Sequence, residues 1–192
     1  MPWLWRGTGE YMKQKQKKRE KAELESLLLY HGEEILLSGQ MQREKLFIQH
    51  GTVSCFDHSV AVAYTSLRLA VWWRIKVDRR SLVRGALLHD YFLYDWHEAD
   101  DSHRLHGFRH AKKALLNARE DFRLNAKEED IIVKHMFPLN LSLPRYRESV
   151  LVILADKWCA LTEILAVFSV VHRVKAIKAK LQKAASRILS TA

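Results

Sequence analysis

Apolar residues recur through most of the chain at intervals of three and four, the spacing that places side chains on one face of an α-helix. One such stripe, at i, i+4, i+7, i+8 and i+11, is formed by Leu82, Ala86, His89, Asp90 and Leu93. Asp78, just upstream, has the side chain of a good N-cap. The pattern predicts a helix that turns an adjacent His and Asp toward the core, where both are costly to bury.

The same periodicity predicts further helices on both sides of this one, over residues 18–37, 54–76, 110–122, 125–135 and 148–168. Asn125 and Glu128 have the spacing of a capping box, which places a helix start between them. The whole chain has only seven glycines and three prolines, so long stretches run without a break. This composition favours helices over strands, and the expected fold class is all-α.

A length of 192 residues suits one substantial hydrophobic core and is short for two. We expect a basic N-terminal helical arm over residues 1–40, one domain over 41–172, and a basic C-terminal helix over 173–192. The formal net charge is +10, and much of the excess lies in the two end segments. Such ends can attract nucleotides, nucleic acid or an anionic membrane surface, or can simply be solvated helix faces.

The two cysteines, Cys55 and Cys159, have no Cys-x-x-Cys partner and do not form the dense disulfide framework of a small secreted domain. No stretch approaches the roughly 20 apolar residues needed to cross a bilayer. Met1 to Trp5 is apolar but gives way at once to charged residues, so no ordinary signal region is expected. These features predict a cytoplasmic protein without a membrane span.

Six histidines and aspartates on the predicted helices are the candidate metal ligands: His58, His89, Asp90, His110, His135 and Asp156. Imidazole nitrogen and carboxylate oxygen suit divalent iron, manganese, cobalt, nickel and zinc. A single histidine on an apolar face is usually a hydrogen-bonded core residue, so the metal site is indicated only by the six residues together. Asp156 follows the apolar run 151–155, where an ionised carboxylate needs a counter-charge. Adjacent helical residues diverge by about 100°, so Asp90 can bridge two ions beside His89.

Three segments resemble the signature of the HD-domain superfamily of metal-dependent phosphohydrolases. They are His58-Ser59-Val60-Ala61-Val62-Ala63, Leu87-Leu88-His89-Asp90 and Leu154-Ala155-Asp156-Lys157, within residues 49–165. The extended stretch from Leu88 to His97 is most similar to a bacterial HD branch with a Leu-His-Asp-Tyr-Phe-Leu-Tyr-Asp-Trp-His signature. The chain departs from other branches, with Met136-Phe137-Pro138 in place of Gly-Tyr-Pro and Tyr91-Phe92-Leu93 in place of Ile-Gly-Lys.

The resemblance implies an HD-like helical bundle that binds one or two divalent transition-metal ions. It makes His58, His89, Asp90 and Asp156 ligands of the first ion, and it gives His110 and His135 to a second. The implied activity is hydrolysis of a small phosphoester, such as a nucleotide, through a metal-activated water. Beside the ligand Asp90, Arg84 and Lys157 are the candidate catalytic cations for the phosphoryl group.

Two other functions remain open at this stage. The same ligands with iron could support a di-iron oxygenase of the HD-like type, and the basic ends could belong to a non-catalytic polyanion-binding module. The aromatic segment 91–96 could stack on a nucleobase, although packing in the core or in a homodimer contact is the commoner role of such residues. Among partners, a small phosphoester is favoured over nucleic acid.

Overall fold

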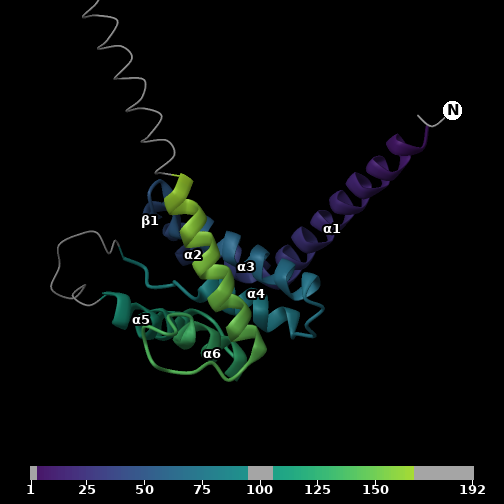
Figure 1. The fold of residues 1–192 in the computed structure, drawn as a ribbon. Coiled ribbons are helices and arrows are strands. Elements are labelled where there is room, and N and C mark those ends of the chain that lie inside the picture. Colours follow the sequence, from purple (N-terminus) through teal and green to yellow (C-terminus); the bar gives the residue numbers. More distant parts are fainter. Residues whose placement is uncertain (1–3, 95–105, 167–192) are drawn as a thin grey trace, which may run out of the picture.

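The computed structural model describes residues 4–94 and 106–166, and within these ranges the chain is mostly helical, as predicted (Figure 1). The helices are α1 (Leu4–Leu36), α2 (Gly39–Arg43), α3 (Cys55–Trp72), α4 (Arg79–Leu88), α5 (His106–Asp121), α6 (Ala126–Lys134) and one over residues 147–166, with a short 3-10 helix η1 (Glu44–Leu46). A small antiparallel hairpin joins β1 (Ile48–His50) to β2 (Val53–Ser54) and pairs Ile48 with Ser54. The predicted helix over 173–192 lies outside the described residues.

Short polar side chains fix where three of these helices begin. Ser54 accepts a hydrogen bond from the Asp57 amide at the start of α3, and Asp78 does the same for the Ser81 amide at the start of α4. At α6, Asn125 and Glu128 form the predicted capping box, because each side chain accepts from the backbone N–H of the other. These caps fix the residue at which each helix begins, and the start of a helix decides which of its side chains face the core.

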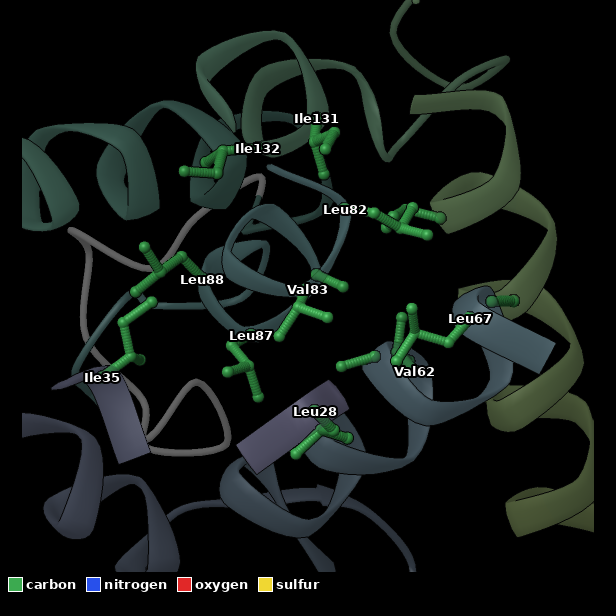
Figure 2. Close-up of a cluster of buried hydrophobic side chains, with 14 of the residues drawn as sticks. Leu28, Ile35, Val62, Leu67, Leu82, Val83, Leu87, Leu88, Ile131 and Ile132 are labelled. Atoms are coloured by element: carbon green, nitrogen blue, oxygen red, sulfur yellow. The ribbon is translucent and has the colours of Figure 1, made fainter. Parts of the chain in front are cut away.

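The core is centred on α4, which contacts α1, α3, α5 and α6. Figure 2 shows buried apolar side chains of α1, α3 and α6 meeting those of α4. The labelled residues are Leu28, Ile35, Val62, Leu67, Leu82, Val83, Leu87, Leu88, Ile131 and Ile132. Because α4 is covered on several sides, the His-Asp pair that follows it is held inside the molecule.

The predicted N-terminal arm is one long helix, and it begins earlier than the expected residue 18. Leu24, Leu28 and Ile35 of α1 are buried in the common core, so the second half of α1 belongs to the folded domain. Its first half extends away from the other helices (Figure 1). The predicted stop at Ser38-Gly39 matches the observed end at Leu36, after which Ser38 caps the short helix α2.

The His-Asp pair lies just past α4 rather than within it, which differs from the predicted stripe. His89 is the C-cap residue, and the chain turns after it, so that the Phe92 amide donates to the Asp90 carbonyl at 2.8 Å. Leu93 adopts a left-handed backbone conformation with φ 61°. None of the helices in the described ranges is both long and apolar enough to span a membrane.

Candidate metal centre

The structure brings all six predicted metal ligands together, from five different helices or helix ends. His58 lies in the first turn of α3, His110 lies in α5, and Asp156 lies in the helix over 147–166. They form two groups, His58 with His89 and Asp156, and Asp90 with His110 and His135. Within each group the candidate ligand atoms lie within 4.8 Å of one another.

His89 and His135 are positioned by the same kind of local hydrogen bond. Each is the C-cap of its helix, α4 or α6, and its Nδ1–H donates to the backbone carbonyl three residues earlier, Ala86 at 2.7 Å and Ile132 at 2.8 Å. This bond leaves Nε2 of each ring as the atom that can bind a metal ion. The two ring centroids lie 5.0 Å apart.

The first group is built around His58, whose side chain has no exposed surface. Its Nδ1 lies 3.0 and 3.1 Å from the two oxygens of Glu163, and its Nε2 lies 3.1 Å from Oδ1 of Asp156. His89 Nε2 is 3.8 Å from the same Asp156 oxygen. A carboxylate that holds the rear nitrogen of an imidazole is the usual support of a histidine metal ligand.

The second group is built around Asp90, whose two oxygens face different neighbours. Oδ1 lies 3.3 Å from Nε2 of both His110 and His135, while Oδ2 lies 3.3 Å from Nε2 of His89. His110 and His135 bring their Nε2 atoms within 2.8 Å of each other. Asp90 is therefore placed between the two groups and contacts both.

Charges within the cluster oppose the effect of burial on its pKa values. Burial alone lowers the pKa of His58, but its hydrogen bonds with Asp156 and Glu163 raise it to about 9. Burial also lowers the pKa of His89, and the adjacent Asp90 charge raises it well above the ordinary value. For Asp90, burial raises the pKa and the charge of His89 holds it well below its usual range. The carboxylates are thus ionised, the state in which they bind cations.

The cluster meets the physical requirements of a divalent-metal site. Ligands that are each about 2.0–2.2 Å from one ion lie at most about 4.4 Å apart, close to the spacing within each group. Nε2 of His89 and Oδ1 of Asp90 are buried and have no hydrogen-bond partner, although burying such atoms unpaired is costly. Burial lowers the pKa of His135, which favours the neutral imidazole that a metal ion requires. These side chains could hold a metal ion, and their unpaired atoms would become its ligands.

Other polar residues support the cluster, and sequence reasoning did not single them out. Glu163 holds His58, and Gln49 of β1 donates to Asp90 Oδ2 at 2.6 Å. Asn117 of α5 donates to the carbonyls of Tyr91 and Phe92, which fixes the turn after Asp90. Only Asn117 had a sequence signal, because it shares a predicted helix face with His110.

The two predicted substrate-binding cations have different positions. Arg84 is buried, and its three guanidinium nitrogens bond Glu128, Glu34 and the Arg123 carbonyl. None of these three contacts is with the metal cluster, so the arginine acts within the core and is not part of the proposed mechanism.

Lys157 lies beside the cluster, on the exposed side of the helix over 147–166. Its Nζ donates to the backbone carbonyl of His135 at 3.2 Å. Tyr91 and Phe92, the start of the aromatic segment, are buried and pack in the interior, and residues 95–105 lie outside the described part. Of the two predicted substrate-binding cations, Lys157 is the one that the described geometry brings near the candidate ligands.

The comparisons with known proteins found no match: no protein-family model fits the sequence, and no curated protein and no solved structure is significantly similar. The resemblance to HD-domain proteins therefore depends on the motif residues and on their convergence in space. The chemistry of this site is therefore the main indication of function.

Proposed function

We propose that the protein is a metal-dependent phosphohydrolase that uses two divalent ions to cleave a phosphoester of a nucleotide or a related small molecule. The observation that carries the proposal is the pair of buried three-residue groups joined by Asp90. In this assignment His58, His89 and Asp156 hold one ion, His110 and His135 hold the other, and Asp90 serves both.

The charge balance of the cluster favours a phosphate-bearing substrate. Asp90 and Asp156 supply two negative charges against two divalent ions, so the loaded site keeps an excess of positive charge. Bound ions of this kind make a water acidic enough to act as a nucleophile near neutral pH and polarise a phosphoryl oxygen. Lys157 provides a further cation next to the ligands.

The residues behind the ligands keep them ready to bind. Glu163 and the two helix carbonyls accept the Nδ1–H protons of His58, His89 and His135, which directs all three Nε2 atoms inward. Imidazoles held at Nδ1 in this way need no ring rotation when an ion takes the place of a proton on Nε2, and supporting partners of this kind typically contribute 10–100-fold to metal affinity or activity.

The test is a panel of phosphomonoesters, phosphodiesters and nucleotides, assayed with chelator-treated protein to which Mn²⁺, Co²⁺, Ni²⁺, Zn²⁺ or Fe²⁺ is returned. We expect metal-dependent hydrolysis in the wild type and at least a 100-fold loss in Asp156→Asn. Asp121→Asn is the matched control, because Asp121 bonds Tyr91 and is not among the ligands. Activity that survives Asp156→Asn would come from a contaminant. Turnover that needs both iron and dioxygen would point to the oxygenase instead.

A further inference from the structure

Gln49 is a buried polar residue whose side chain contacts the candidate metal centre. It is buried, it lies on a strand of only three residues, and its Nε2 donates to Oδ2 of Asp90 at 2.6 Å. The two residues are 41 positions apart in sequence, so the contact exists only in the folded protein. It links the small hairpin directly to the candidate metal centre.

The amide of Gln49 is itself held in a fixed orientation. Its Oε1 accepts a hydrogen bond from the thiol of Cys55 at 3.2 Å, and Cys55 is fully buried at the start of α3. Because an ionised carboxylate can only accept, the amide turns its nitrogen toward Asp90 and its oxygen toward Cys55. The orientation of the hydrogen bond to Asp90 is therefore set by the fold.

The two carboxylate oxygens of Asp90 have different neighbours, and Gln49 forms a hydrogen bond with only one of them. Oδ2 receives the amide N–H, whereas Oδ1 has no hydrogen-bond partner and faces His110 and His135. A carboxylate pinned at one oxygen cannot rotate freely about its terminal bond. Oδ1 is thereby kept directed at the second group of ligands.

We infer that Gln49 is a positioning residue for the metal centre: through Asp90 it orients the carboxylate that joins the two groups of ligands. This inference rests on the proposed metal site. Removal of such a partner typically weakens metal affinity 10–100-fold, because the free carboxylate must be ordered when the ion binds. The structure assigns Cys55 the supporting role of fixing the amide.

The experiment titrates Co²⁺ alone into chelator-treated protein and follows visible absorption, which reports both affinity and coordination geometry. Gln49→Met keeps the length of the side chain but has no N–H donor, and we expect 10–100-fold weaker Co²⁺ binding with an altered absorption spectrum. Gln49→His, whose ring can present an N–H at similar reach, should recover most of the affinity. Thermal unfolding of each variant establishes that it is folded.

The matched control is Gln42→Met, the same chemical change in a neighbouring segment. Gln42 donates to the Leu36 carbonyl and touches no ligand, so Co²⁺ binding should equal that of the wild type. Wild-type Co²⁺ affinity and spectrum in folded Gln49→Met would overturn the inference about Gln49 while leaving the metal site intact. If the wild type binds no Co²⁺, the proposed function fails together with this inference, so the two failures are distinguishable.

Discussion

Gly85 of α4 lies against Ile131 of α6, and the two residues stand one helical turn before His89 and His135, respectively. A Cβ added to Gly85 would lie 2.5 Å from Ile131 Cδ1 and 2.9 Å from its Cβ. The missing side chain therefore permits a close approach of the two helices just where both end in an inward-facing histidine. The fold uses a glycine inside a helix, which is itself unfavourable, to bring ligands together.

Gly85→Ala should separate these helices and weaken the metal site. We expect a loss of about 1–3 kcal/mol in the free energy of unfolding, because Ile131 meets the new methyl group with its branched carbon and not only with a flexible end. Co²⁺ affinity should fall in the same variant. Gly39→Ala serves as the control, because a Cβ there meets nothing within 4 Å. Equal unfolding curves for the two variants would contradict this interpretation of the glycine.

Arg84→Met should destabilise the protein by about 3–5 kcal/mol, since it leaves the buried Glu128 without its closest cation. Chemical denaturation measures the effect. Arg80 contacts the same Glu128 oxygen at 3.3 Å but is half exposed, so Arg80→Met should cost no more than about 1 kcal/mol. If Arg84 instead binds substrate, the variant would keep its stability and show a raised KM.

Glu44 should make stability depend on pH. Burial raises the pKa of this carboxyl to about 8, so the folded state keeps its proton while the unfolded state loses it near 4.5. The contribution of Glu44 to stability is therefore highest below pH 4.5, falls as the pH rises to about 8, and is level above. Glu44→Gln cannot ionise but keeps an oxygen for the Leu93 amide.

Between pH 4.5 and 8, the wild type should therefore lose about 4–5 kcal/mol of unfolding free energy relative to Glu44→Gln. The figure follows from about 1.36 kcal/mol for each unit by which the pKa differs between the folded and unfolded states. Denaturant titrations at four or five pH values, all with the same chelator, provide the comparison. Parallel stability profiles would show that the carboxyl ionises normally.

The sequence was sufficient to predict the helical class, two of the caps and the six candidate ligands that the fold brings together. Asp78 and Asn125 lie next to the helices that they cap, so local spacing reveals them. The candidate ligands were found as a set because histidine and aspartate are rare on apolar helix faces. The domain limits proposed from composition remain predictions, although Leu24 and Leu28 place part of the expected arm in the core.

What the sequence did not reveal depends on contacts between distant segments. The hairpin over 48–54 has strands of three and two residues, too short for an alternating pattern to stand out. Gln49 and Glu163 are ordinary polar residues until folding places them against Asp90 and His58. Arg84 has a charge suited to phosphate, but the carboxylates that surround it come from α1 and α6.

The central claim is that the six side chains bind divalent ions at two linked positions. The most direct measurement is elemental analysis of chelator-treated protein after equilibrium dialysis against Co²⁺, compared with Asp90→Asn under the same conditions. We predict about two ions per chain in the wild type and a clear reduction in the variant, because Asp90 faces both groups. A wild-type protein that is folded and retains no Co²⁺ would contradict the account.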